Sequence, residues 1–220
     1  MAGQSKSSEI DTSMPLTREA IFAKALEIAD EEGIENASAR KIATRLGKTP
    51  MALYRHCDSV EDIQQGALAL AFSEVDTAPI PGERWDDTVR RTTASIRAMY
   101  FRHKNAHLYK VESTALSSGL IEHTSRVQAL HRAQGIPADV LERFWRIIDA
   151  FLGGFVANEA SELDVMRIEE SFEPSTLPEW AKTVEGAYSD QAFHDGIEII
   201  IAGIRSMSAP DPCDWHTPKA

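Results

Sequence analysis

The stretch Ser38–His56, SARKIATRLGKTPMALYRH, decides the fold of this 220-residue sequence. Its pattern predicts two short helices joined by a tight turn. Gly47 stands where the first helix ends, a place that often needs a left-handed residue, and glycine adopts that conformation without steric cost. Thr49-Pro50 is a start signal for the second helix, because threonine caps it and proline needs no N–H donor there. With Ala43 allowing close approach and Leu53 filling the joint, the spacing is that of a helix-turn-helix.

This stretch is basic although the chain as a whole is acidic, with a formal charge of −11. A basic segment without acidic residues is what a surface that binds nucleic-acid phosphates requires. The alternative is a solvated helical hairpin in an all-helical domain, and the combination of spacing and charge weighs against it. The lysines and arginines between Ala37 and Cys57 are Arg40, Lys41, Arg45, Lys48 and Arg55.

Composition is that of an ordinary globular protein, with 43% hydrophobic and 26% charged residues. No apolar run approaches the roughly 18 residues that a membrane helix needs. The first residues, MAGQSKSSEIDTSMP, lack the apolar core of a secretion signal, and two cysteines are too few for a disulfide framework. We therefore expect a cytoplasmic protein with no membrane partner.

Apolar stripes at helical spacing, interrupted by glycine and proline, continue along the chain and predict an all-α fold. The expected helices cover residues 16–33, the two of the helix-turn-helix, one beginning at Ser59, then 85–103, 106–115, 120–134, one from Pro137 to about 170, and 190–207. The expected organisation is a disordered arm (1–14), a helix-turn-helix DNA-binding domain (15–60), a larger helical domain for effector binding and dimerisation (61–207) and a tail (208–220).

The segment LTREAIFAKALEIADEEGIENASARKIATRLGKTPMALYRHCDSVEDI resembles the DNA-binding domain of the tetracycline-repressor (TetR) family. The resemblance covers roughly residues 16 to 70, and its most specific part is Thr49–His56. It implies a repressor that binds a palindromic operator as a homodimer and is released by a small-molecule effector. Val60 departs from the family, which often has a phosphate-binding lysine there, so that contact is lost or supplied elsewhere.

The resemblance also implies which side chains meet the DNA. Pro50, Met51, Ala52 and Arg55 would face base edges in the major groove. Tyr54 and His56 would contact or support phosphates, and Arg40 would approach the groove from the preceding helix. The expected DNA-binding residues are Arg40, Lys41, Lys48, Thr49, Pro50, Met51, Ala52, Tyr54, Arg55 and His56.

The helices from Pro137 and Asp190 are apolar on more than one face, so each needs cover on more than one side. The simplest cover is the same pair of helices from a second chain. Their sequences, FWRIIDAFLGGFVANEASELD and FHDGIEIIIAGI, also resemble the dimer-forming helices of the TetR-like C-terminal class. We expect the interface to contain Phe155, Ile197, Ile200, Ile201 and Ile204.

An effector cavity needs apolar walls with a few polar groups. The larger domain offers a set of aromatic and aliphatic side chains, with one histidine as a polar group, although most of them are better explained as plain core, as apolar stripes usually are. The expected lining is Trp85, Met99, Tyr100, His103, Phe144, Trp145, Ile148 and Phe151.

Two other classes remain as alternatives: an all-helical enzyme and a DNA-binding protein without an effector. The sequence has no G-x-S-x-G motif, no glycine-rich phosphate loop and no CxxC pair, so we expect no catalytic residues and no cofactor. His103 and His107 have a spacing that can bind zinc. Asn105 lies at an expected helix end that would spoil this geometry, and we expect no metal.

Overall fold

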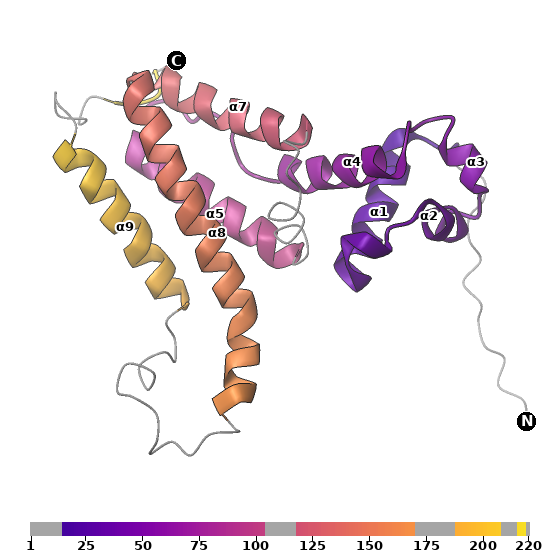
Figure 1. Ribbon diagram of the computed structural model, residues 1–220. Coiled ribbons are helices and arrows are strands. Elements are labelled where there is room, and N and C mark those ends of the chain that lie inside the picture. Colours follow the sequence, from indigo (N-terminus) through magenta and orange to yellow (C-terminus); the bar gives the residue numbers. More distant parts are fainter. Residues whose placement is uncertain (1–14, 104–117, 170–187, 208–214, 219–220) are drawn as a thin grey trace, which may run out of the picture.

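The computed structural model describes residues 15–103, 118–169, 188–207 and 215–218, and it confirms the all-α fold (Figure 1). The helices are α1 (Arg18–Glu32), a short 3-10 turn (Ile34–Asn36), α2 (Ala39–Arg45), α3 (Pro50–Leu53), α4 (Val60–Ser73), α5 (Trp85–Arg102), α7 (Ser118–Ala133), α8 (Ala138–Glu169) and α9 (Asp190–Met207). None of them is long and apolar enough to cross a membrane. The expected arm (1–14) and the expected helix over 106–115 lie outside the described residues.

The first four helices begin where their capping residues predict. Each follows a serine or threonine whose hydroxyl accepts a backbone N–H of the first turn, a contact that stabilises a helix by about 1 kcal/mol. Thr49 does this for α3 through Ala52, at 3.3 Å. Gly47 has φ 64°, the left-handed conformation that the turn between α2 and α3 requires.

The small N-terminal unit is held together by α1 lying against α4. Ile21 and Ala25 of α1 and Ile63 of α4 are fully buried. The two helices come so close that a Cβ at Gly66 would stand 2.3 Å from the Phe22 ring. Any larger residue at position 66 would therefore have to displace the Phe22 ring or move α4 away from α1.

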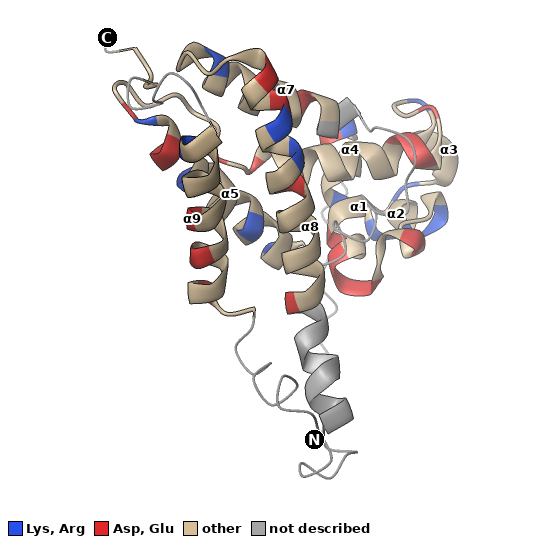
Figure 2. Cartoon of the chain, turned by 60° about the vertical axis from the view of Figure 1, so that its left-hand side comes forward, with Lys and Arg blue, Asp and Glu red and all other residues tan. Residues whose placement is uncertain are grey.

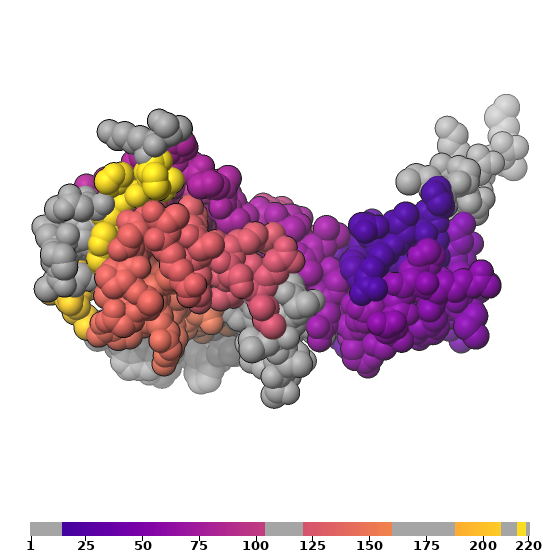
Figure 3. Space-filling model, turned by 90° about the horizontal axis from the view of Figure 1, so that it is seen from above, coloured from indigo at the N-terminus to yellow at the C-terminus, as the bar shows by residue number. Residues whose placement is uncertain are grey.

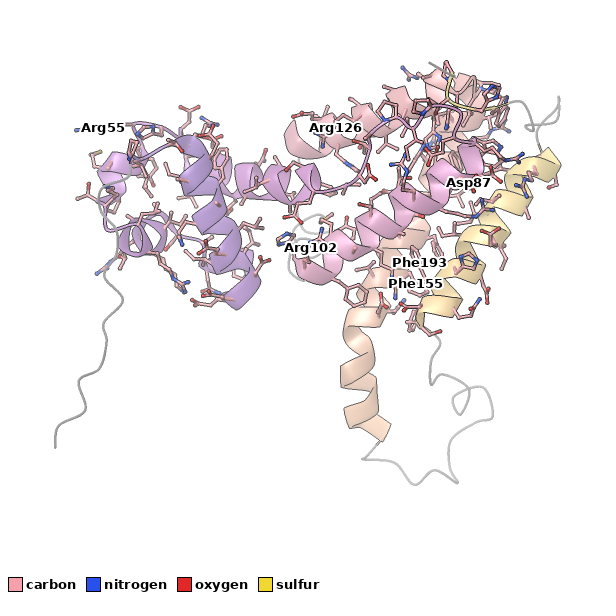
Figure 4. The ribbon with its side chains drawn as sticks, turned by 180° about the vertical axis from the view of Figure 1, so that it is seen from behind. Arg55, Asp87, Arg102, Arg126, Phe155 and Phe193 are labelled. Atoms are coloured by element: carbon pink, nitrogen blue, oxygen red, sulfur yellow. The ribbon has the colours of Figure 1, made fainter. Side chains whose placement is uncertain are left out.

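The larger unit is built on α5, which packs against α8 and α9. Its Arg97 side chain forms an ion pair with Glu159 of α8 and lies 4.8 Å from the centre of the Phe193 ring of α9. The Phe155 and Phe193 rings meet edge to face, 5.3 Å apart, between α8 and α9 (Figure 4). A guanidinium over an aromatic face adds roughly 0.5–2 kcal/mol to such an ion pair, so Arg97 joins three helices at once.

Helix α4 connects the two units (Figure 1), and the small unit projects to one side of the larger one when seen from above (Figure 3). The last turn of α4 packs against α7, where the Phe72 ring stacks on His123 with centroids 4.9 Å apart. Arg126 of α7 donates to the Phe72 carbonyl at 3.4 Å. A movement of α7 is therefore transmitted directly to α4.

The end of the chain differs from the expected tail. Residues 215–218 run along the loop before α5, and Trp215 and Thr217 are buried. The Trp215 carbonyl accepts the Trp85 N–H at 3.0 Å, and the two indole rings meet edge to face. The proline-rich sequence suggests an unstructured end, but the unsatisfied donors of the first turn of α5 give these residues a partner.

A buried histidine should make folding stability depend on pH. Burial lowers the pKa of His131 to about 4, and its Nδ1–H donates to Gln134 Oε1 at 2.9 Å. The unfolded chain, with a histidine pKa of about 6.5, binds the proton more readily than the folded one between these two values. Stability from this residue is therefore fully present above about pH 6.5 and is lost as the pH falls toward 4.

We predict that the unfolding free energy of the wild type falls by about 2 kcal/mol more than that of His131→Asn between about pH 6.5 and pH 5. The asparagine amide can replace the Nδ1–H donor but does not titrate. Denaturant unfolding followed by circular dichroism measures both free energies. Parallel pH profiles of the two proteins would mean that His131 has the same pKa in the folded and unfolded chains, and would contradict this prediction.

Candidate nucleic-acid interface and ligand cavity

Helix α3 presents one face outward and buries the other. Leu53 is fully buried and fixes the short helix on the small unit, whereas 71% of Met51 and 44% of Tyr54 are exposed. Arg55 follows α3 and is exposed at the outer end of this unit (Figure 4). The arrangement offers an apolar side chain, a phenol and a guanidinium to a large partner on one surface.

Of the remaining expected DNA-binding residues, Thr49, Pro50 and His56 are exposed, while Lys48 and Ala52 are half-buried. Threonine and proline also form the start of α3, so part of their role is local. These residues all surround α3, and the structure therefore brings most of the expected set to one place.

The cations of α2 fall into two groups. Lys41 pairs with Glu32, and Arg45 pairs with Glu31 at 2.6 Å and with Glu32 at 3.0 Å. The hydrogen bond from Arg45 lowers the pKa of the Glu31 carboxyl below its usual value. Arg40 is exposed and forms no ion pair with another described residue. Lys41 is one of the expected DNA-binding residues, but its ammonium pairs with Glu32 of α1.

A cavity of about 400 Å³ lies in the larger unit, between the end of α4 and helices α5, α7 and α8. Its buried side chains are mostly aromatic or aliphatic, and its rim is polar and exposed. This size and lining are typical of a site for a small organic molecule. The lining residues are Phe72, Ile96, Tyr100, Ile121, His123, Thr124, Ser125, Val127, Gln128, Glu142, Trp145, Arg146, Asp149 and Leu152.

Only Tyr100 and Trp145 of the eight expected lining residues reach this cavity, so the expected set needs correction. The others are used in packing. Four are buried in the core, namely Trp85, Met99, Phe144 and Ile148. Phe151 packs on Phe155 and on Gly196.

His103, the eighth residue, instead joins the two units. Its Nδ1 lies 2.8 Å from Asp30 Oδ2 of α1, and its Nε2 lies 3.1 Å from Glu74 Oε1 just after α4. Partial burial would raise the pKa of Glu74, but hydrogen bonds from His103 and Arg102 outweigh it and lower the pKa. The end of α5 thus holds the small unit by polar contacts, close to the apolar contact between α4 and α7.

The cavity residues that were not expected from the sequence include Phe72, His123 and Asp149. Phe72 ends the apolar face of α4 and His123 lies on α7, and neither position has a local pattern that distinguishes it from core. Their pairing arises only when the two helices pack. The one usable signal was Asp149, a carboxylate within the apolar run of α8.

Burial raises the pKa of the Tyr100 phenol above its usual value, and the charge of Asp149 raises it further. The hydroxyl therefore stays protonated at neutral pH. Within the described residues no three His, Cys, Asp or Glu side chains are grouped as a metal ion would need. The mostly apolar lining of the cavity is suited to an organic ligand.

Comparison with known proteins decides the family. The family model described as "Tetracyclin repressor-like, C-terminal domain" matches residues 78–208, more than half of the chain. This chain belongs to the tetracycline repressor (TetR) family. It is a transcriptional regulator, and regulators of this family bind DNA operators and small-molecule effectors, so the resemblance of the N-terminal segment is confirmed.

Individual relatives agree with the family. The tetracycline repressor protein class C of Escherichia coli is 24% identical over 202 residues, which cover 87% of this chain and 92% of that protein. The Streptomyces coelicolor TetR family protein ActR, solved in complex with actinorhodin, has a TM-score of 0.71 at 23% identity, covering 89% of this chain and 98% of ActR. BioQ, solved with its double-stranded DNA operator, has a TM-score of 0.60 at 18% identity, covering 87% and 99%. The two structures show a shared fold.

We predict that Arg40→Ala weakens DNA binding by this TetR-family chain and reduces the slope of log affinity against log salt by about 1, because one phosphate contact is lost. Arg45→Ala is the matched control on the same helix and should leave the slope nearly unchanged, since its guanidinium lies at Glu31 and Glu32. Fluorescence anisotropy at several salt concentrations measures both. An equal change in the control would mean that the ion pairs of Arg45 open on DNA.

Proposed function

We propose that this chain is a repressor that binds a palindromic operator as a homodimer and is released by a small molecule bound in the cavity. The observation that carries the proposal is the double role of α4. Its first half packs in the small unit that presents α3, and its last turn supplies Phe72 to the cavity wall. A ligand that touches Phe72 acts on the helix that supports the DNA-binding surface.

The proposed switch requires the dimer to adopt two states that differ in the distance between its two α3 helices. A ligand changes their populations only if it binds one spacing more tightly than the other. The stacked rings of Phe72 and His123 connect α4 to α7. A molecule that enters between α7 and α8 would push on α7 and through it on α4, so it would bind the two states with different affinity. Moving α4 then changes the distance between the two α3 helices, which must match successive major grooves.

The similarity to ActR supports a ligand in this place, since that protein was solved with actinorhodin. The similarity to BioQ supports DNA as the partner of the small unit, since that protein was solved with its operator. Both likenesses extend over most of this chain.

The proposed dimer surface is formed by the sides of α8 and α9 that face away from α5. Ile199 is 72% exposed and Ile147 is 52% exposed, large values for isoleucine. Residues 150–158 of α8 carry no charge, and the middle of this helix is correspondingly tan in Figure 2. A Cβ on Gly154 or Gly203 would meet nothing within 4 Å, so these glycines leave room for a second helix. A second copy of the chain would cover this face.

This surface differs from the one expected from the sequence. Phe155, Ile197, Ile201 and Ile204 are buried within the single chain, where they pack α8 and α9 on α5, and only Ile200 remains half-exposed. An apolar stripe identifies the side that a helix buries but not which chain buries it. The proposed partner-facing side of each helix is the exposed side next to this buried stripe, and it includes Ile199.

Selection of bound DNA from a random pool tests the proposed function with the full-length protein. A two-fold symmetric consensus is expected, because a symmetric dimer binds two equal half-sites. Adding a ligand that fits the cavity should then release the selected DNA. Recovery of DNA without any consensus would contradict sequence-specific regulation.

On the selected operator, Arg55→Ala and Tyr54→Ala should act differently. Arg55 is the exposed cation nearest α3, and a bidentate contact to guanine gives about 1–3 kcal/mol of base discrimination. Its loss should relax the preference at one position of each half-site. Tyr54→Ala should weaken all sequences about equally, because phosphate contacts carry no direct sequence information. Binding to the operator and to single-base variants distinguishes these results, and an even loss with Arg55→Ala would exclude it as a base contact.

Ile199→Asp should give a folded monomer that no longer binds the two-half-site operator. The side chain is exposed in the single chain, so a carboxylate there costs little except in a dimer. Ile201→Asp is the matched control two positions away. It places a carboxylate in the core, at a cost of several kcal/mol, and should lose helix signal instead. Light scattering and circular dichroism separate the two outcomes, and a dimeric Ile199→Asp protein would rule out this surface.

A further inference from the structure

The end of α5 places one histidine ring between two carboxylates. The side chain of His103 is only 10% exposed, and its Nδ1 and Nε2 lie 2.8 Å from Asp30 and 3.1 Å from Glu74. Asp30 belongs to α1 of the small unit, and Glu74 directly follows α4, the helix that joins the two units. The ring therefore connects the larger unit to the helices that support the DNA-binding surface.

The number of donors on this ring depends on its charge. A neutral imidazole has one N–H donor and one acceptor nitrogen, whereas an imidazolium has two donors. Both nitrogens of His103 face carboxylate oxygens, which accept hydrogen bonds and donate none when they are ionised. A neutral ring would bring the lone pair of one nitrogen against a carboxylate oxygen. Only an imidazolium satisfies both contacts at once.

The surrounding carboxylates agree with a cation at this position. Burial would raise the pKa of the Glu74 carboxyl, but hydrogen bonds from His103 and Arg102 lower it, so Glu74 stays ionised. Among the described residues, Asp30 forms an ion pair with His103 alone, and its buried Oδ1 accepts no hydrogen bond. A neutral His103 would leave this partly buried carboxylate without a counter-charge, which is unfavourable.

Other charged groups on the neighbouring helices have partners of their own. Lys24 of α1 pairs with Glu27, and Arg126 of α7 pairs with Glu122. His123 of α7 stacks on the last turn of α4 and is a second titratable ring close to this helix. An experiment on the first ring therefore has to leave His123 in place.

We propose that His103 is a pH-sensitive latch, whose imidazolium holds the small unit in the arrangement that binds the operator. Histidine in water changes its charge near about pH 6.5. Loss of the proton removes one of the two hydrogen bonds, so the latch is present at lower pH and weakens as the pH rises. This inference goes beyond release by a ligand, but it rests on the proposed function because it acts on operator binding by the dimer.

A held small unit favours operator binding for an entropic reason. The two α3 helices contact both half-sites only at one particular spacing. Units that are already held at this spacing lose less conformational freedom on binding than units that move freely. Deprotonation of His103 therefore weakens binding to the operator.

Operator affinity at about pH 6 and about pH 8, measured by fluorescence anisotropy with the full-length protein, tests the latch. The variant is His103→Gln, whose amide keeps one donor and does not titrate. We expect the loss of affinity between the two pH values to be about tenfold greater in the wild type than in the variant. Both proteins retain His56 and His123, so their contributions cancel in this comparison. An equal loss, or a greater loss in the variant, overturns the proposal.

Two further variants locate the effect. Asp30→Asn removes the counter-charge but keeps an oxygen acceptor, so it should reduce the pH effect as His103→Gln does. His194→Gln is the matched control, because it removes an exposed histidine of α9 and should keep the pH effect of the wild type. Circular dichroism checks that each variant is folded at both pH values. A wild-type pH effect in Asp30→Asn, or its loss in His194→Gln, overturns the assignment to His103.

Failure of the latch can be told apart from failure of the proposed function. If the selected operator is bound and the wild type and His103→Gln respond equally to pH, the function holds and the latch is wrong. If the DNA selection gives no consensus, the proposed function is wrong, and the latch is removed with it.

Discussion

Helix α4 has to pack in two surroundings at once, and the rest of the structure depends on this. Ile63 and Ala67 are fully buried in the small unit, where the Phe22 ring lies against Gly66. Two turns later Phe72 is buried between α5 and α7. Because an α-helix transmits displacement along its axis with little bending over four turns, neither end can shift without the other. The geometry of α3 relative to the larger unit is thereby set by side chains in the cavity wall.

The second connection between the units is polar, and it complements the apolar one. His103 contacts Asp30 and Glu74, and Arg102 contacts Glu74 as well. Packed apolar surfaces resist sliding because they interlock, whereas hydrogen bonds between side chains can be remade in a nearby geometry. The combination suits a helix that must move by a small amount without separating from its neighbours. This combination is compatible with the small displacement of α4 that the proposed function requires.

Helix positions could be predicted from the sequence because caps, glycines and apolar stripes act over a few residues. Thr49 and Ser59 begin their helices as predicted, and Gly47 makes the turn. The cavity could not be predicted in the same way, because Phe72 and His123 meet only through the packing of two helices. The stripe containing Ile197 and Ile201 was assigned to a partner chain, yet it is buried in its own. Periodicity reports that a face is covered, and only tertiary structure shows what covers it.

The distribution of charge gives the protein one direction of approach to DNA. A chain with a formal charge of −11 repels a polyanion over most of its surface. Next to α2, the acidic residues Glu31 and Glu32 of α1 are paired with Lys41 and Arg45 of α2. Their repulsion of DNA phosphates is therefore locally cancelled. Arg40 and Arg55 then act on a nearly neutral background within a Debye length of about 8–10 Å. If α3 binds the groove as proposed, the acidic body disfavours encounters with DNA in the other orientations.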